Sequence, residues 1–138
     1  MILDDESYNC DVLKTMILSM DIDPQRLIVC MSGKEALSKM KEVKNEGGRI
    51  SLVLTDLSMP MMDGYKFIKK FKRLEGEQKA TIAAITGHAE SHFFLNAFKK
   101  GADHVYSKPV SSIHISLLML QAGFIIKANQ KVMNALNY

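Results

Sequence analysis

Three carboxylates follow two short apolar segments of the sequence. Asp4 and Asp5 come directly after Ile2-Leu3, and Asp56 follows the apolar run over residues 50–55. If both segments are parallel strands, the carboxylates share the edge of the sheet where ligands bind in α/β proteins. Carboxylates brought together repel one another, so one must take a proton or all must share a cation. A Mg²⁺ ion held by two carboxylates, a carbonyl and water is the simplest solution.

Two further polar residues end later apolar runs. Thr86 follows the run over residues 81–85, and Lys108 comes shortly after the run over residues 104–106. Lys108 would supply a mobile positive charge and Thr86 a hydroxyl donor. A carboxylate, Mg²⁺, an ammonium group and a hydroxyl around one point indicate phosphoryl transfer with an aspartate nucleophile.

The elements that position these residues follow a βα rhythm. Short apolar runs without alternation predict strands covered by helices on both faces. We expect five strands, over residues 2–3, 26–30, 50–55, 81–85 and 104–106. Apolar residues at three-and-four spacing predict the helices between them. The five units account for one domain over residues 1–122. The three phenylalanines of the fourth helix pattern, Phe93, Phe94 and Phe98, are interpreted mainly as core and edge packing.

Composition excludes several other classes of protein. The chain has 138 residues and a net charge of +3, which is too mild to indicate a nucleic-acid partner. No apolar run reaches the length of about 18 residues that a membrane span needs. Cys10 and Cys30 match no metal or redox spacing, and the chain begins with no secretion signal. We therefore expect buried thiols in a reducing compartment, the cytoplasm.

Four motifs occur in order along the chain, each at an expected strand end. They are Asp4-Asp5-Glu6, the nine residues DLSMPMMDG at 56–64, Thr86-Gly87-His88-Ala89, and Lys108-Pro109. Together they resemble the receiver domain of two-component response regulators, in the form attached to hybrid sensor histidine kinases. The resemblance extends to about Leu120. It implies a flavodoxin-like, doubly wound parallel sheet in strand order 2-1-3-4-5, with helices on both faces.

The resemblance implies a role for each acidic residue. Asp56 would be the phosphoacceptor that takes a phosphoryl group from a phosphohistidine on a histidine kinase or a histidine phosphotransfer protein. Asp5 and Asp56 would bind Mg²⁺ directly, together with the backbone carbonyl of Ser58, and Asp4 would hold the ion through water. The domain would catalyse only its own phosphorylation and dephosphorylation, and would contact neither nucleic acid nor membrane.

The resemblance also implies how the phosphoryl group is sensed. Lys108 and Thr86 would bind its oxygens, and Thr86 would act with Tyr106 as the switch between two surface conformations. The peptide bond before Pro109 is expected to be cis. Ser58 and His88 occupy the positions that tune the lifetime of the acyl phosphate.

Two other functions stay open. A phosphatase of the haloacid-dehalogenase type also uses Asp, Mg²⁺, Thr and Lys, but it carries a second Asp where this chain has Ser58. A pseudo-receiver that binds without taking phosphate usually lacks one of the acids or the lysine. Single residues also have ordinary roles: Asp4-Asp5 could cap a helix, His88 and His92 are taken as surface residues, and a half-buried Tyr106 is common in strands.

The two ends of the chain depart from the family pattern. Only three residues precede the acid pair, which predicts a truncated first strand that leaves backbone groups of its neighbours unpaired. Residues 123–138 form a C-terminal extension with apolar residues at helical spacing, expected to be a short helix or a tail. We expect the chain to be part of a longer protein, with a hybrid sensor kinase as the favoured parent.

Overall fold

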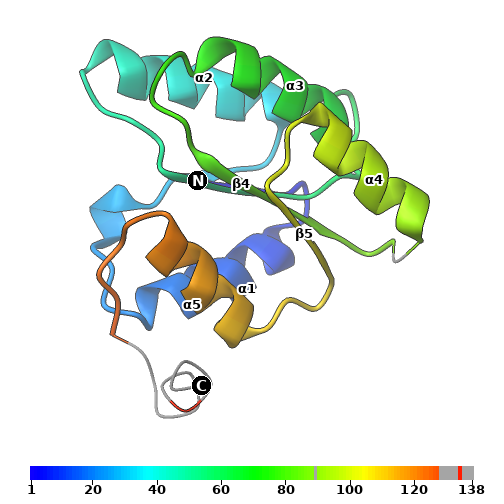
Figure 1. Ribbon diagram of the computed structural model, residues 1–138. Coiled ribbons are helices and arrows are strands. Elements are labelled where there is room, and N and C mark those ends of the chain that lie inside the picture. Colours follow the sequence, from blue (N-terminus) through cyan, green and yellow to red (C-terminus); the bar gives the residue numbers. More distant parts are fainter. Residues whose placement is uncertain (89, 128–133, 135–138) are drawn as a thin grey trace.

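The fold is a five-stranded parallel sheet with helices on both faces (Figure 1). The computed structural model describes residues 1–88, 90–127 and 134. The strand order is β2-β1-β3-β4-β5, as predicted. The strands are β1 (Ile2–Leu3), β2 (Val29–Cys30), β3 (Leu52–Thr55), β4 (Thr81–Thr86) and β5 (His104–Ser107).

Two helices cover one face of the sheet and three cover the other. The helices are α1 (Ser7–Leu18), α2 (Gly33–Asn45), α3 (Gly64–Leu74), α4 (Ser91–Lys100) and α5 (Ser112–Gln121). α1 and α5 pack together below the sheet in Figure 1, and α2, α3 and α4 lie side by side above it. A separate cluster of buried apolar side chains lies between the sheet and the helices on each face. Because β3 contributes to both clusters, it is buried along its whole length.

The largest core side chains belong to α3 and face the sheet. Phe67 and Phe71 are fully buried, and their ring centroids lie 5.7 Å apart. On the other face Leu13 of α1 and Leu118 of α5 belong to the second cluster. Asp63 is the N-cap of α3, and its side chain accepts a hydrogen bond from the backbone N–H of Lys66. This N-cap fixes where the helix starts relative to the preceding loop.

Two local predictions are wrong. The strand expected over residues 26–30 is confined to Val29–Cys30. Arg26 instead ends a 3₁₀ helix over Pro24–Arg26, because the Asp23 side chain accepts a hydrogen bond from Gln25 N and Pro24 favours a helical start. In α4 only Ala97 is buried, and 46% of Phe98 is exposed, so the three phenylalanines of this helix do not form a core. Phe93 instead stacks on His88 and His92.

The first strand is short, as predicted, yet it is bonded to both neighbours. Ile2 is in register with Val29 of β2 and with Leu54 of β3. Leu54 N donates to the carbonyl of Met1 at 2.9 Å, and Ile2 N donates to Ile28 O at 2.8 Å. The Met1 amino group donates to Leu52 O at 2.8 Å. The expectation that the short strand leaves its neighbours unpaired is therefore wrong at these positions.

The buried amino group of Met1 makes stability depend on pH. Burial lowers its pKa from 8.0 to about 6. The unfolded chain binds more protons between these two values, so the free energy of unfolding of the 138-residue chain with a free Met1 amino group should rise by about 3 kcal/mol as the pH increases from below 6 to above 8. Urea unfolding at pH 5 and pH 9 measures this change. A chain acetylated at Met1 keeps the donor but cannot titrate there, so its pH dependence should be smaller by that amount. Parallel pH profiles for the two chains would contradict the prediction.

The C-terminal extension returns toward α1. Phe124 N donates to Met119 O, and Lys127 N donates to Met20 O. The guanidinium of Arg26 lies 4.8 Å from the ring centroid of Phe124. Residues 124–127 are not helical, and the rest of the predicted helix, except for residue 134, lies outside the described residues. Within the part of the chain that the structure describes, no helix is both long enough and apolar enough to span a membrane.

Candidate functional site: an acidic cluster with a lysine

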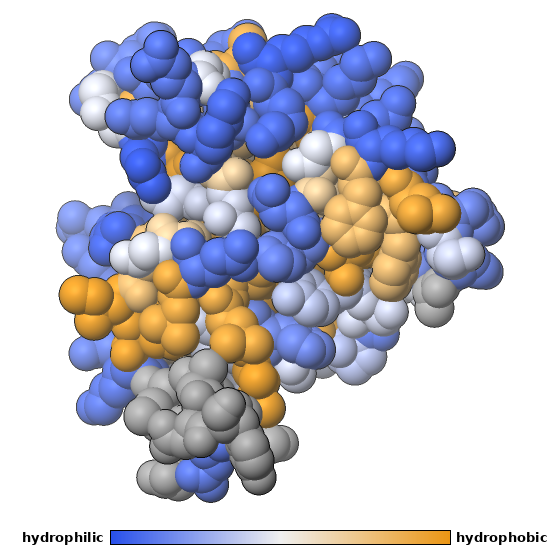
Figure 2. Space-filling view, in the orientation of Figure 1, coloured by the Kyte–Doolittle hydropathy of each residue, from blue (hydrophilic) through white to orange (hydrophobic). Residues whose placement is uncertain are grey.

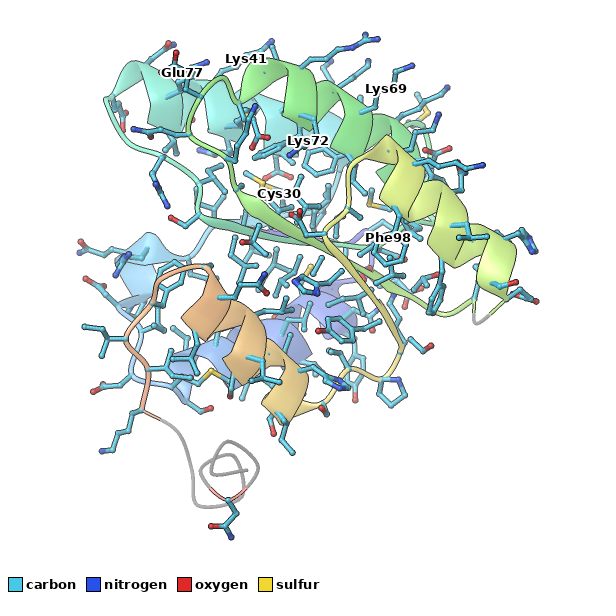
Figure 3. The ribbon with its side chains drawn as sticks, viewed as in Figure 1. Cys30, Lys41, Lys69, Lys72, Glu77 and Phe98 are labelled. Carbon is cyan, nitrogen blue, oxygen red and sulfur yellow. The ribbon has the colours of Figure 1, made fainter. Side chains whose placement is uncertain are left out.

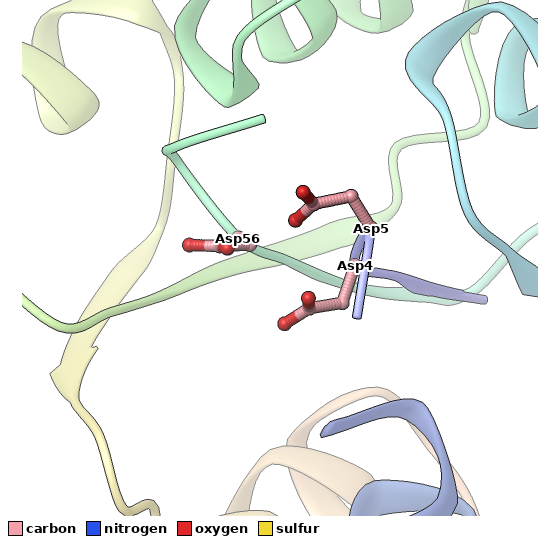
Figure 4. A group of neighbouring side chains, drawn as sticks. All are labelled: Asp4, Asp5 and Asp56. Atoms are coloured by element: carbon pink, nitrogen blue, oxygen red, sulfur yellow. The ribbon is translucent and has the colours of Figure 1, made fainter. Parts of the chain in front are cut away.

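The structure brings the three predicted carboxylates together. Asp4 and Asp5 follow β1 and Asp56 follows β3, and these two strands are neighbours in the sheet. Each of the three offers one oxygen, and the three oxygens lie within 4.8 Å of one another. Figure 4 shows the side chains grouped where the two strands end. Asp4 and Asp56 are buried and Asp5 is half-buried, so the cluster is open on one side.

Asp56 is held in one orientation by its own loop. Its Oδ1 accepts hydrogen bonds from Leu57 N at 2.7 Å and from Ser58 N at 3.3 Å. Its Oδ2 faces the Lys108 ammonium at 3.3 Å. One oxygen is therefore fixed by the backbone, and the other lies beside a mobile cation.

Gly64 closes the loop that carries Asp56. Gly64 N donates to Leu57 O at 2.9 Å. A Cβ atom at this position would overlap the carbonyl oxygen of Asp56 and lie 2.7 Å from Leu57 Cα. The close approach of these two backbone segments requires glycine. In the sequence Gly64 stands out only as part of a motif, and its packing role was not predicted; the Asp63-Gly64 pair at the helix start is the signal that indicates it.

Asp4 is already engaged by other groups. Its Oδ2 lies 3.1 Å from Lys108 Nζ, and its Oδ1 accepts from Glu6 N at 2.9 Å and from the Asn9 amide at 3.4 Å. Asn9 was not singled out in the sequence. Asp5 differs, because no hydrogen bond or ion pair to its side chain is found among the described residues. The two adjacent acids thus have different environments.

Lys108 bridges two of the carboxylates. Burial lowers the pKa of its ammonium, but the hydrogen bond to Asp4 and the charge of Asp56 outweigh this, so the pKa is raised overall. The peptide bond between Lys108 and Pro109 is cis. Lys108 N also donates to the carbonyl of Thr86 at 2.8 Å, which joins the ends of β4 and β5. The cation is therefore fixed to the sheet by its backbone and to the acidic cluster by its side chain.

The predicted switch residues lie on the neighbouring strands β4 and β5. Thr86 is fully buried, and its hydroxyl accepts a hydrogen bond from His88 N at 3.1 Å. Tyr106 is half-buried and stacks on His114 of α5, with ring centroids 4.6 Å apart, and on His104 at 6.1 Å. The two histidines were not predicted, because their contact with Tyr106 depends on how α5 packs. Ser58 and His88 are both exposed, in the loops that follow β3 and β4.

The donor set suits a hard divalent cation. All three clustered ligands are carboxylate oxygens, which Mg²⁺ prefers, and no sulfur or imidazole is among them. Two buried carboxylates beside a third also need positive charge, which the single ammonium of Lys108 supplies only in part. The residues present therefore fit Mg²⁺.

A groove leads from the acidic cluster along α1. Its volume is about 380 Å³, and its lining joins Asp56 and Lys108 to apolar residues that include Val12, Met16 and Val110. At the same edge three large apolar side chains are exposed: 75% of Tyr8, 45% of Met31 and all of Met61.

Comparison with known proteins identifies the family. Residues 1–119 match the model of the response regulator receiver domain. The chain belongs to this family. This confirms the resemblance, and with it the assignment to two-component signalling by receivers of the kind found in hybrid histidine kinases.

The receiver is similar to segments of much longer kinases. It is 32% identical over 105 residues to the peroxide stress-activated histidine kinase mak1 of Schizosaccharomyces pombe, covering 74% of this chain and 6% of that protein. It is 25% identical over 133 residues to the osmosensing histidine protein kinase SLN1 of Saccharomyces cerevisiae, covering 95% of this chain and 11% of that protein. The chain thus spans only a small part of these relatives.

Solved structures share the fold of the receiver. The co-crystal structure of the S. cerevisiae histidine phosphotransfer protein Ypd1 with the receiver domain of Ssk1 matches with a TM-score of 0.74 and 22% identity, covering 88% of this chain and 86% of that chain. The CheX-CheY-BeF3-Mg+2 complex from Borrelia burgdorferi matches with a TM-score of 0.74 and 21% identity, covering 90% and 87%.

Proposed function

We propose that this receiver accepts a phosphoryl group on Asp56 from the phosphohistidine of a histidine kinase or a histidine phosphotransfer protein. The observation that carries the proposal is the cluster of Asp4, Asp5 and Asp56 with Lys108 placed 3.1 Å from Asp4 and 3.3 Å from Asp56. This is the set of charges that in-line phosphoryl transfer to a carboxylate needs.

The transfer forms one bond and breaks one. Oδ2 of Asp56 attacks the phosphorus atom of the phosphohistidine, while Leu57 N and Ser58 N hold Oδ1. The bond between phosphorus and the imidazole nitrogen breaks, the imidazole leaves with the electron pair, and an acyl phosphate remains on Asp56. Lys108 lies beside the attacking oxygen, where its charge offsets that of the incoming phosphoryl oxygens.

The different environments of the three acids support an assignment of the metal ligands. Asp5 and Asp56, with the backbone carbonyl of Ser58, would hold Mg²⁺ directly. Asp4 would act through water, which is supported by the engagement of both its oxygens with Glu6, Asn9 and Lys108. When bound there, Mg²⁺ would neutralise charge on the phosphoryl oxygens and the carboxylates.

The response would pass through the ends of β4 and β5. After transfer, the Thr86 hydroxyl would give up its hydrogen bond from His88 N and bind the phosphoryl group. Lys108 would give up its ion pair with Asp4 and pair with the phosphoryl oxygens instead. Tyr106 lies opposite Ile85 in the register of these strands, so a shift of Thr86 reaches its ring and the surface of α5. This is a shift between two populations of the domain.

The groove along α1 would receive the phosphodonor. Tyr8 lines this groove together with Asp56, and the exposed Met31 and Met61 follow β2 and β3 at the edge of the sheet to which a donor protein must bring its phosphohistidine. The fold shared with the Ssk1 receiver, which is crystallised with a phosphotransfer protein, supports this class of partner. A hybrid histidine kinase as the parent protein and the cytoplasm as the location belong to the same proposal.

A transfer assay tests the function. A histidine phosphotransfer protein labelled with ³²P on its histidine is incubated with the receiver and Mg²⁺. Label should move to the receiver, and chelation of Mg²⁺ by EDTA should slow the transfer by at least about tenfold. Label that stays on the donor in the presence of Mg²⁺, with several donors tested, would contradict the proposed function.

Removal of Lys108 should separate phosphorylation from the response. The Lys108→Ala receiver still has the Asp56 nucleophile and the metal ligands, so we expect it to take up phosphate. It lacks the ammonium that pairs with phosphoryl oxygens, so the protection of β5 and α5 amides against hydrogen exchange should change less on phosphorylation than in the wild type. Lys14→Ala, an exposed lysine of α1, is the control. A full change in Lys108→Ala would refute the role of Lys108 in the switch.

A further inference from the structure

Three aromatic rings form a cluster where the turn after β4 meets the start of α4. The ring centroid of Phe93 lies 4.5 Å from that of His88 and 4.2 Å from that of His92. Both histidines are exposed and Phe93 is half-buried, so the cluster lies at the surface and contributes little to the core. None of these rings takes part in the phosphoryl transfer proposed for Asp56.

His88 connects this cluster to the phosphoryl-binding hydroxyl. Its backbone N–H donates to Thr86 Oγ1 at 3.1 Å, while its imidazole stacks on Phe93 with an angle of 25° between the ring planes. Thr86 is fully buried, and no other hydrogen bond to its side chain is found among the described residues. The ring of Phe93 therefore holds the residue to which the Thr86 hydroxyl is bonded.

Phe93 is itself fixed to a neighbouring helix. Its carbonyl oxygen accepts a hydrogen bond from the Tyr65 hydroxyl of α3 at 3.4 Å. Glu90, the N-cap of α4, provides no capping hydrogen bond from its side chain. The contacts of Phe93 thus join the turn after β4 to the first turn of α4, and they join α4 to α3.

The rest of α4 makes few buried contacts. Ala97 is its one buried residue, and Figure 2 shows hydrophobic residues at the surface over this helix, where Leu95 and Phe98 are exposed. A segment with few buried contacts can shift at a low cost in free energy. The stack of His88 on Phe93 is therefore a point at which a movement of α4 can be coupled to Thr86.

We propose that Phe93 is a positioning residue of the switch, which acts on Thr86 through His88. The stack holds His88 N beside the Thr86 hydroxyl and so stabilises the unphosphorylated arrangement. When Thr86 turns to a phosphoryl group on Asp56, this hydrogen bond breaks and the stack is given up. The role of Phe93 rests on the proposed phosphorylation of Asp56, and it sets how readily the domain responds to the phosphoryl group.

Loss of the Phe93 ring should make the domain respond more readily. A stacked aromatic pair changes an equilibrium by a factor of about two to ten, so the switched population of Phe93→Ala should rise by that factor. Beryllofluoride with Mg²⁺ serves as a stable analogue of the phosphoryl group, and the NMR peaks of β5 and α5 amides follow its binding. The analogue favours the switched state, so its apparent affinity should tighten by the same factor. A merely structural defect would not tighten binding.

Three further variants separate this route from a general loosening of α4. Phe93→Tyr keeps an aromatic ring and should bind the analogue as the wild type does. His88→Ala removes the stack from the other side, so it should bind more tightly, and it carries the test if Phe93→Ala does not fold. Leu95→Ala truncates a side chain of α4 that is 59% exposed, and it should change the affinity by less than about 1.5-fold. Phe98 is a poorer control because it lies where α4 approaches β5 (Figure 3), the strand whose peaks are read.

Two results would overturn the role of Phe93 alone. The first is an unchanged or weaker affinity in Phe93→Ala and His88→Ala while the wild type binds the analogue. The second is an equal gain in Leu95→Ala, which would show that any loosening of α4 has this effect. A wild-type receiver that does not bind the analogue would contradict the phosphoacceptor function itself, and the role of Phe93 with it.

Discussion

Replacement of Asp56 by Asn should abolish phosphorylation of the receiver. The amide has nearly the shape of the carboxylate, but its oxygen is neutral and cannot attack phosphorus, so transfer should fall by at least about a hundredfold. The fold should not suffer, because Asn can still accept hydrogen bonds from Leu57 N and Ser58 N, and one charge leaves a cluster of like charges.

The control for this variant is Asp63→Asn. Asp63 lies in the same loop, and its side chain caps α3. Asn is an equally good N-cap, so this variant should keep both stability and transfer. Transfer to Asp56→Asn at the wild-type rate would rule out Asp56 as the phosphoacceptor.

Replacement of Gly64 by Ala should cost the receiver much of its stability. The new Cβ would overlap the Asp56 carbonyl oxygen and press on Leu57 Cα, and both of these neighbours are backbone that cannot rotate away. We expect a loss of about 3 kcal/mol in the free energy of unfolding, measured with urea. Because the displaced segment carries Asp56, phosphorylation of the remaining folded protein should also slow.

Gly87→Ala provides the comparison for Gly64→Ala. No atom lies within 4 Å of a Cβ built at Gly87, so this substitution should change the unfolding free energy by less than about 0.5 kcal/mol. A similarly small change in Gly64→Ala would mean that the loop and α3 can separate, and that the tight approach is not needed to hold Asp56.

The sheet and the acidic cluster could be predicted because local sequence determines them. β3 and β4 are buried along most of their length, and this requires the unbroken apolar runs over residues 52–54 and 82–85. The order of the strands follows from the family resemblance and the βα rhythm, and it brings Asp4, Asp5 and Asp56 to one edge.

The features that were missed depend on contacts between distant elements. The bridge from Lys108 to Asp4 spans 104 residues of sequence, and the stacking of Tyr106 on His114 depends on the position of α5. The phenylalanines of α4 were interpreted as core and edge packing, because periodicity shows that a helix has an apolar side, but not whether another element covers that side.

Location of the phosphate on the wild-type receiver is the most direct test of the proposed function. The receiver is incubated with a small phosphodonor and Mg²⁺, and the acyl phosphate is reduced with borohydride, which converts the phosphorylated aspartate to homoserine. Peptide mass spectrometry should then find homoserine at position 56 alone, and only in samples that contained Mg²⁺. Homoserine at Asp4, Asp5 or Asp63, or none at position 56, would contradict the assignment of Asp56 as the phosphoacceptor.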